Sequence, residues 1–343
     1  MDIASMTMGE LTEYMQGKGL AKFRAKQVYE WMHKHFIFDA SLMTNLSNAD
    51  REKIKDDLPV IEEETRLVSK KDGTIKFLMK MPDGQMIETV FMRYHHGNSV
   101  CISSQAGCRM GCRFCASTIG GLVRNLEPSE MLYQVYHAMK ATGERVSNIV
   151  IMGTGEPLDN YDNVLRFIDL ITSENGYNLS ERSITLSSCG LVPKIRELAD
   201  RKLQITFALS LHATTDEERR SLMPVAERYN LKETLEACRY YFDVTGRRLT
   251  FEYSLVRGVN DSEDHARRLS TLIRGMNAHV NLIPVNPVEE RKYKGTASAE
   301  VEKFKNILEK NRINVTIRKG MGSDIDAACG QLRRKYGKIQ EKS

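Results

Sequence analysis

The stretch Cys101-Ile-Ser-Ser-Gln-Ala-Gly-Cys108-Arg-Met-Gly-Cys112-Arg-Phe-Cys115 carries the strongest signal in this chain. Cys108, Cys112 and Cys115 follow a C-x3-C-x2-C spacing, which lets one loop present three thiolates to a soft metal centre. Ordinary iron–sulfur clusters and structural zinc sites use four protein ligands, but the local count here is three. The spacing therefore predicts an iron–sulfur cubane with one iron open to another ligand. The alternative is a zinc knuckle whose fourth ligand lies elsewhere.

The composition of the chain limits its class. A length of 343 residues allows one large domain and a small one, and 41% apolar residues are enough for a sizeable core. The net charge of +5 permits a nucleic-acid partner without requiring one. Clustered thiols, the lack of a signal sequence and the lack of a membrane-length apolar run predict a cytoplasmic protein with no membrane contact.

Residues 1–60 have the apolar spacing of helices and predict a small N-terminal domain. The second predicted helix carries an apolar face and, opposite it, the basic set Lys22, Arg24, Lys26, His33 and Lys34. This basic face is either a solvated helix surface or a phosphate-contacting surface that would make residues 1–60 an RNA-binding domain. Residues 61–97 then change to the alternation of strands, with turns at Asp72-Gly73 and Pro82-Asp83-Gly84, and predict an antiparallel β-meander linker.

From residue 98 onward, strands and helices alternate. The predicted strands are 99–103, 148–152, 183–187, 204–210, 249–255, 280–284 and 314–318. Parallel strands joined by crossover helices have both faces buried, and six strand–helix units are too few for a closed eight-fold barrel. The sequence therefore predicts an α/β fold, an open partial (β/α)6 barrel over residues 98–322. A C-terminal loop and tail follow at 323–343.

Several polar motifs come directly after these strands, where such barrels bind ligands. Each has an ordinary alternative as a tight turn or a helix cap, but several strand ends that face one mouth favour a ligand site. Near the C-terminus, Cys329 lies in Asp-Ile-Asp-Ala-Ala-Cys-Gly-Gln-Leu; for this thiol and for Cys101 the alternative is a small buried side chain. Cys189 and Cys238 are expected in the core. The strand-end motifs are Gly153-Thr-Gly155-Glu156-Pro157, Ser187 with Ser188, Ser210-Leu211-His212, and Asn286.

Taken together, these motifs resemble the radical SAM RNA adenine methyltransferases over nearly the whole chain. The resemblance implies a radical SAM barrel in an RNA methyltransferase that consumes two S-adenosylmethionine (SAM) molecules per turnover. Cys108, Cys112 and Cys115 would hold one [4Fe–4S] cluster. The resemblance also makes Cys329 the methyl-carrying cysteine and Cys101 the cysteine that resolves the intermediate. The residues that would hold SAM are Gly155, Glu156, Ser187, Ser210, Leu211, His212 and Asn286.

The resemblance further implies that Glu88 accepts a proton; the alternative is an acidic side chain on the solvated face of a strand. The implied substrates are C2 of an adenosine at the peptidyl-transferase centre of 23S rRNA and C2 of the adenosine 3′ to the anticodon in tRNAs. The implied partner is an electron donor such as flavodoxin or ferredoxin, and the chain would act as a monomer. Basic runs at 291–294, 318–319 and 333–335 would contact phosphates or simply be solvated.

Two other functions stay open from the sequence. One is methylation at C8 of the same rRNA adenosine, an activity of a sibling group in the same family. The other is a non-catalytic zinc protein that binds RNA through its basic head.

Overall fold

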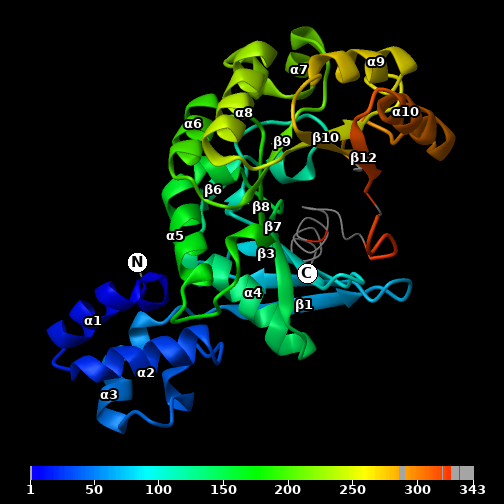
Figure 1. Cartoon of the computed structure of the whole chain (residues 1–343). Coiled ribbons are helices and arrows are strands. Elements are labelled where there is room, and N and C mark those ends of the chain that lie inside the picture. Colours follow the sequence, from blue (N-terminus) through cyan, green and yellow to red (C-terminus); the bar gives the residue numbers. More distant parts are fainter. Residues whose placement is uncertain (1, 286–289, 319, 326–331, 333–343) are drawn as a thin grey trace.

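A computed structural model describes residues 2–285, 290–318, 320–325 and 332, and its centre is one ten-stranded sheet (Figure 1). The strands follow the order β1-β2-β3-β4-β7-β8-β9-β10-β11-β12. Neighbours from β4 to β12 are parallel. The parallel part comprises β4 (Asn98–Ile102), β7 (Val146–Ile151), β8 (Ile184–Ser188), β9 (Thr206–Ser210), β10 (Leu249–Leu255), β11 (Ala278–Pro284) and β12 (Asn314–Ile317).

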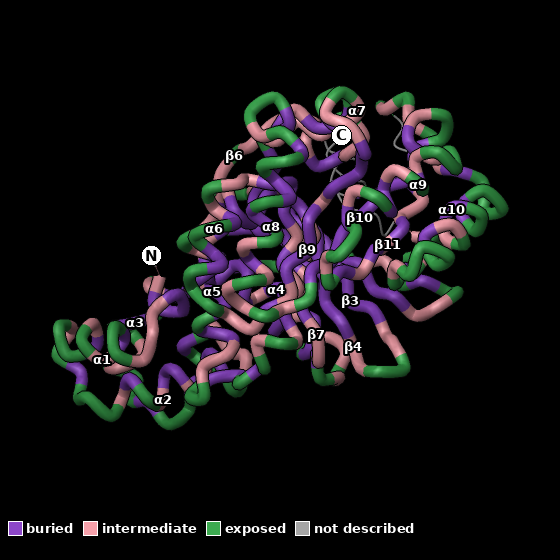
Figure 2. The backbone as a smooth tube through the Cα atoms, turned by 45° about the horizontal axis from the view of Figure 1, so that its top comes forward, coloured by how far each residue is buried: buried purple, intermediate pink, exposed green. Residues whose placement is uncertain are grey.

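A helix follows each of the first six parallel strands, so the predicted open partial (β/α)6 barrel is confirmed. The helices form the outer layer, and their exposed sides face away from the buried strands (Figure 2). Among the described strands, β1 and β12 are the two edges of the sheet. The helices are α4 (Pro128–Thr142), α5 (Tyr161–Thr172), α6 (Val192–Asp200), a short α7 (Asp216–Leu222), α8 (Leu231–Thr245), α9 (Glu263–Leu272) and α10 (Ser298–Lys310).

The bounds of α4 follow from its sequence. Glu127 and Glu130 form a reciprocal capping box, and Pro128 occupies the first turn, where its missing N–H costs nothing. The helix ends at Gly143, which adopts the left-handed conformation with φ of 70°. The same signals, a capping box before the helix and a left-handed glycine after it, bound α8.

The β-meander continues the main sheet. It consists of β1 (Glu62–Val68), β2 (Ile75–Lys80) and β3 (Met86–Met92), all antiparallel, and β3 pairs with β4. Phe91 packs into the main core, while Val90 and Met92 point to the other face and contact Cys101. A strand with apolar side chains on both faces is stable only when both faces are covered. The meander therefore forms one wall of the barrel.

The N-terminal head contains α1 (Met8–Gly17), α2 (Lys22–His33) and α3 (Asn48–Ile54), and it lies beside the outer helices (Figure 1). Lys22, Lys26 and Lys34 are exposed, as the predicted basic face requires. The placement of His33 on that face is wrong, because its ring is fully buried with Nδ1 3.2 Å from the Tyr136 hydroxyl of α4. The last turn of α2 packs on the barrel, so its basic side is not solvent-facing throughout.

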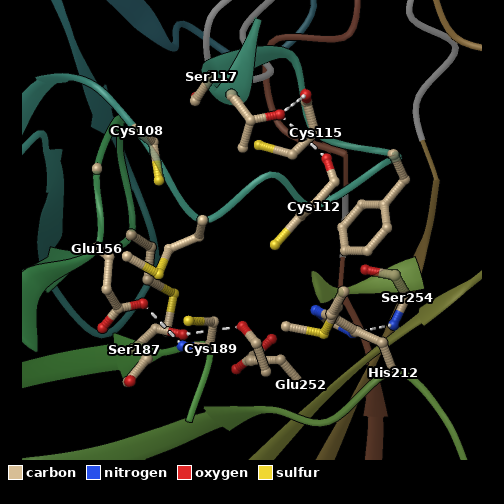
Figure 3. A pocket seen from close by; sticks show the side chains of 18 of the residues that line it. Cys108, Cys112, Cys115, Ser117, Glu156, Ser187, Cys189, His212, Glu252 and Ser254 are labelled. Carbon is tan, nitrogen blue, oxygen red and sulfur yellow. Dashed lines mark hydrogen bonds between the residues drawn. The ribbon is translucent and has the colours of Figure 1, made fainter. Parts of the chain in front are cut away.

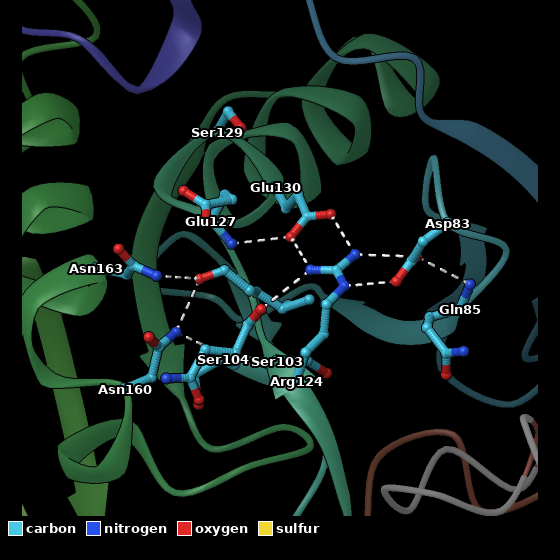
Figure 4. A network of polar contacts seen from close by, with 12 residues as sticks. Asp83, Gln85, Ser103, Ser104, Arg124, Glu127, Ser129, Glu130, Asn160 and Asn163 are labelled. Atoms are coloured by element: carbon cyan, nitrogen blue, oxygen red, sulfur yellow. Dashed lines mark hydrogen bonds and ion pairs between the residues drawn. The ribbon is translucent and has the colours of Figure 1, made fainter. Parts of the chain in front are cut away.

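A two-stranded hairpin, β5 (Gln105–Gly107) and β6 (Leu122–Asn125), brackets the cysteine loop and was not predicted from the sequence. Gly107 has φ of +84°, and a Cβ there would lie 2.1 Å from the Gly121 carbonyl oxygen, so the crossing requires glycine. Arg124 pairs with Asp83 at 2.6 Å and Glu130 at 2.7 Å, and these carboxylates raise its pKa (Figure 4). The base of the cysteine loop is thus tied to the meander and to α4.

Within the described part of the chain, none of the helices has both the length and the apolar character needed to cross a bilayer.

Candidate functional site

One pocket of about 190 Å³ lies between the cysteine loop and the carboxyl ends of the parallel strands (Figure 3). Eight of the residues that the sequence predicted for cluster and SAM binding line it: Cys108, Cys112, Cys115, Gly155, Glu156, Ser187, Ser210 and His212. They come from different strand ends and one loop, so the fold brings together what the sequence holds up to about a hundred residues apart.

The cysteine loop is held in place by hydrogen bonds to its backbone. The Thr118 hydroxyl donates to the carbonyl oxygens of Cys112 and Cys115, both at 3.1 Å. Arg291 donates to the same Cys115 oxygen at 3.3 Å and to the Thr118 hydroxyl at 2.9 Å. Arg291 belongs to the basic run that was expected either to contact phosphates or to be solvated, and in this structure its guanidinium supports the loop. The three thiols consequently project from a fixed backbone into the pocket (Figure 3).

The chemistry of these thiols fits an iron–sulfur cluster. Burial raises the pKa of Cys108 to about 12 and also raises the pKa of Cys112. Because the thiolate is the form that binds metal, such buried cysteines need a positively charged centre to stabilise them. Among the described residues, no three Cys, His, Asp or Glu side chains gather closely enough for a single metal ion. In a cubane each thiolate binds a different iron, so cysteines spread around one pocket match that donor set.

The wall formed by β7 and β8 is built on close backbone contacts. Gly155 has φ of +112°, and a Cβ there would lie 2.6 Å from Cβ of Gln105. The buried Glu156 accepts hydrogen bonds from the backbone N–H of Leu158 at 3.1 Å and of Cys189 at 2.8 Å. Burial is the main influence on this carboxyl and raises its pKa. Both of its oxygens therefore already have partners within the chain.

On the next strands, His212 is held in a strained conformation with φ of 56°. Its Nδ1 accepts a hydrogen bond from the backbone N–H of Ser254 at 2.9 Å, so the neutral ring carries its proton on Nε2. Burial lowers the pKa of His212 to about 3. Phe114 of the cysteine loop packs edge-on against the ring at 5.0 Å. His212 is thus a neutral, oriented imidazole in the pocket.

The remaining predicted site residues do not line the pocket or lie outside the described residues. Leu211 is fully buried, and its side chain belongs to the main core. Asn286 and Cys329 lie outside the described residues. Glu88 is buried and pairs with Lys76 at 3.1 Å, so the alternative of a solvated acidic side chain is wrong.

Cys101 lies beside the pocket, in a small apolar cluster with Val90 and Met92. Met152 packs against this cluster and also lines the pocket, so the two sites share a wall. Met321, from the segment that leads toward Cys329 in the sequence, packs against the same cluster. The structure therefore brings the start of the C-terminal segment to Cys101.

That C-terminal segment is anchored on the turn between β1 and β2. Asp324 accepts hydrogen bonds from the Ser69 hydroxyl at 2.6 Å and from the Lys70 backbone N–H at 3.0 Å. In return, the Gly322 backbone N–H donates to Asp72 at 2.8 Å. This bond and those from Thr74 lower the pKa of Asp72 to about 2, against the opposing effect of desolvation. Sequence reasoning missed these contacts because their partners are about 250 residues apart.

Sequence reasoning also missed Glu252 and Ser254, which line the pocket. It named Arg318 only as part of a basic run and placed Cys189 in the core, although both line the pocket. A signal for Glu252 was present. Strand β10 reads Leu-Thr-Phe-Glu-Tyr-Ser-Leu, with polar residues at every second position, and every one of these residues is buried. Buried polar positions on one face of a strand indicate a polar interior rather than a core.

The fold and the cysteine loop define the class of this protein, a radical SAM methyltransferase. A family model described as the radical SAM superfamily matches residues 102–269. A crystal structure of a radical SAM methyltransferase from Sphaerobacter thermophilus superposes with a TM-score of 0.93 and 40% identity, covering 96% of this chain and 98% of that one.

More specific relatives identify the family. A protein of Lachnospira eligens described as a probable dual-specificity RNA methyltransferase RlmN is 59% identical over 98% of this chain and 96% of its own length. Another from Lachnoclostridium phytofermentans with the same description is 58% identical over 98% and 95%. A model of the ribosomal RNA large subunit methyltransferase N-terminal domain matches residues 1–60. The chain belongs to the RlmN family of dual-specificity RNA methyltransferases. It is an enzyme that uses a [4Fe–4S] cluster and SAM, which excludes the non-catalytic zinc alternative.

Proposed function

We propose that this enzyme methylates C2 of a specific adenosine at the peptidyl-transferase centre of 23S rRNA and C2 of the adenosine 3′ to the anticodon in tRNAs. The reaction runs through a methylated Cys329 and a covalent protein–RNA intermediate, and it consumes two SAM molecules per turnover. The observation that carries the proposal is the meeting of three elements: the cysteine-lined pocket, Cys101 beside it, and the anchored segment that leads to Cys329.

The proposed site residues divide into two groups. Cys108, Cys112 and Cys115 hold the cluster. The SAM-binding group surrounds them and consists of Gly155, Glu156, Ser187, Ser210, Leu211, His212 and Asn286. For Leu211, whose side chain is in the core, we propose a contact through the backbone.

The need for a cysteine carrier follows from the substrate. C2 of adenine is an electron-poor carbon that does not attack a methyl sulfonium, so direct methyl transfer fails. When bound, SAM and the cluster supply the methyl group and the radical oxidant. The chain's own part is to carry the carbon on Cys329 sulfur, to bring it to C2 and to exclude water.

The proposed release step uses a second thiol. After the adduct has lost one electron and the C2 proton, the Cys101 thiolate attacks the Cys329 sulfur. The bond between that sulfur and the transferred carbon breaks, its electron pair stays with the carbon, and uptake of a proton there completes the methyl group. A Cys101–Cys329 disulfide remains until a reductant restores both thiols. Glu88 accepts the proton lost from C2. Its place in a buried pair with Lys76, on the same wall as the Cys101 cluster, supports a role inside the barrel.

Three proposals concern partners and location. An electron donor such as flavodoxin or ferredoxin reduces the cluster, the chain acts as a monomer, and it works in the cytoplasm, where its RNA substrates are.

The target adenine leaves its stack to reach the pocket, as nucleobase-modifying enzymes require. The exposed Lys22, Lys26 and Lys34 of the head are proposed phosphate contacts.

Nucleoside mass spectrometry tests the position of methylation. Anaerobically reconstituted enzyme is supplied with SAM, a reductant and an rRNA fragment that contains the target adenosine. We expect 2-methyladenosine in the digest. If 8-methyladenosine alone is found, the C8 activity is the correct assignment.

Three cysteine variants test the carrier mechanism. Cys329→Ala should bind cluster and SAM but never join to RNA, and Cys101→Ala should accumulate the covalent protein–RNA adduct. Cys238→Ala is the matched control, because Cys238 is a buried cysteine of α8 outside the pocket and its variant should turn over normally. Normal turnover by Cys101→Ala would refute the release step.

A further inference from the structure

Glu252 is the buried carboxylate of the pocket that lacks a full set of partners. It lies on β10, its residue is only 3% exposed, and it lines the pocket. Its Oε1 accepts a hydrogen bond from the Asn281 side chain at 2.8 Å. Its Oε2 is buried and has no hydrogen-bond partner among the described residues. An unpaired buried acceptor costs stability, so its retention in a binding pocket calls for a functional explanation.

The neighbours of Glu252 fix which of its atoms faces a ligand. The Oδ1 atom of Asn281 accepts from the Thr316 hydroxyl at 2.7 Å and lies 3.0 Å from Nε2 of His279. This leaves the Asn281 amide nitrogen to donate to Glu252 Oε1. One oxygen of Glu252 is therefore committed to the sheet, and the other is left to accept a hydrogen bond.

The position of Glu252 in the pocket indicates what it meets. In the sheet it is the direct partner of Ser210, one of the proposed SAM contacts. Figure 3 shows it on the floor of the pocket between Cys189 and His212, across from Cys112 and Cys115. Arg318 also lines the pocket and, by its charge, opposes the rise in the pKa of Glu252 that burial causes. An acceptor at this point is suited to a neutral donor group of a nucleoside.

We propose that Glu252 is a ligand-binding residue whose second carboxylate oxygen accepts a hydrogen bond from a nucleoside hydroxyl or amino group in the pocket. Both SAM and the target adenosine carry such groups, and the experiments below separate the two sources. The inference rests on the proposed function for the identity of the ligands but adds a residue to it. Glu156 contrasts with Glu252, because both oxygens of Glu156 already accept backbone hydrogen bonds.

Glu252→Gln is the decisive variant. Because Asn281 must donate to residue 252, the new amide keeps its oxygen on Asn281 and turns its NH2 group toward the ligand. An acceptor is thus replaced by a donor with almost no change in volume. Glu263→Gln is the matched control, since Glu263 lies exposed on α9 and pairs with Arg267 at 2.8 Å, away from the pocket. Both variants should retain the iron content and the circular dichroism of the parent enzyme.

The SAM arm measures dissociation constants by equilibrium dialysis with the reconstituted enzyme. If SAM is the source, Glu252→Gln weakens SAM binding by about 10- to 100-fold, the range expected for loss of a hydrogen bond to a charged group. SAM analogues that lack the 2′ or the 3′ hydroxyl then locate the donor. Removal of the correct hydroxyl weakens binding to the parent enzyme and has little further effect on Glu252→Gln.

The RNA arm measures binding of the rRNA fragment, and the amount of RNA adduct formed in the Cys101→Ala background. If the target adenosine is the source, SAM binding and Cys329 methylation stay normal in Glu252→Gln, while adduct formation falls by about 10-fold or more. Equal SAM affinity and equal adduct formation in Glu252→Gln and the parent would overturn the proposal. The position of the methyl group on the RNA is unaffected by this result, so failure here is distinct from failure of the proposed function.

Discussion

The two walls of the pocket satisfy their polar groups in different ways. In the β7–β8 wall, formed by residues 153–156 and 187–189, both oxygens of Glu156 accept backbone N–H groups, and Gly155 approaches Gln105 too closely for any side chain. In the β9–β12 wall, formed by Ser210, His212, Glu252, Ser254 and Arg318, one oxygen of Glu252 has no hydrogen-bond partner in the part of the chain that the structure describes.

We infer from this difference that the β7–β8 wall sets the shape of the pocket and that the β9–β12 wall recognises the ligand. A wall made of backbone contacts keeps its form whether or not a ligand is bound, as pre-organised sites require. In a wall with an unsatisfied buried acceptor, the missing hydrogen bond forms only when a ligand supplies the donor. The stability of this wall and its affinity for the ligand are therefore coupled. We therefore expect substitutions in the β7–β8 wall to damage folding first, and substitutions in the β9–β12 wall to damage binding first.

The largest effect on stability is expected for Gly155→Ala. The new Cβ would lie 2.6 Å from Cβ and 2.8 Å from the backbone nitrogen of Gln105, and φ of +112° is unfavourable for alanine. Overpacking and backbone strain together should lower the free energy of unfolding by about 3 kcal/mol or more. Chemical denaturation followed by circular dichroism measures the change.

Gly120→Ala is the control for this variant. Gly120 also has a positive φ, of +92°, but a Cβ there meets no atom within 4 Å. Gly120→Ala should therefore lower the free energy of unfolding only by the backbone strain, about 1 kcal/mol. Equal losses for the two variants would show that close packing does not shape the β7–β8 wall.

Features that depend on local sequence patterns could be predicted from the sequence, and features that depend on contacts between distant segments could not. The strand–helix alternation is a local pattern, so the barrel was predicted correctly. The cysteine spacing is local too, and the three cysteines line one pocket, while their role as cluster ligands stays a prediction. The β5–β6 hairpin was missed because its strands are only three and four residues long, too short for a clear alternation of apolar and polar residues. His33 was misplaced because helical periodicity shows which residues share a face but not which face meets a second domain.

The long-range contacts could not be predicted from the sequence. Glu252 and Asn281 lie on neighbouring strands, and Asp324 meets Ser69 across 255 positions of the chain. Nothing in the composition of either segment identifies its partner. The alternating polar residues of β10 were visible, but their use in a pocket follows only from the register of β9, β10 and β11.

An intermediate effect is expected from pH through His212 of the β9–β12 wall. Its pKa is about 3 in the folded protein, against about 6.5 for an unfolded histidine. Between these values the unfolded chain binds a proton that the folded chain does not, so lowering the pH favours unfolding. From pH 7 to pH 5 this one residue should remove about 2 kcal/mol from the free energy of unfolding.

The measurement is a denaturation series at pH 5, 6, 7 and 8, with the parent and His212→Gln compared at each pH. The variant should lose about 2 kcal/mol less than the parent between pH 7 and pH 5. Between pH 8 and pH 7 the two should change almost equally, because both states of the histidine are then mostly neutral. Parallel curves over the whole range would mean that His212 takes up protons in the folded protein.

The smallest effect is expected where the C-terminal segment is anchored, beside the β3–β4 side of the barrel. Asp324→Ala removes the acceptor for the Ser69 hydroxyl and the Lys70 N–H. Ser69 is buried, but Asp324 and Lys70 are exposed, so water can replace part of the loss. The fold should survive, but Cys329 should be held less firmly. We expect methylation of Cys329 by SAM to slow by about fivefold, the effect of losing one modest hydrogen bond, as followed by intact-protein mass spectrometry.

Asp324→Asn keeps one acceptor and should recover part of the rate, while Glu309→Ala, at an exposed acidic residue of α10, should have no effect. An unchanged rate in Asp324→Ala would show that the turn between β1 and β2 does not help to position the methyl-carrying cysteine.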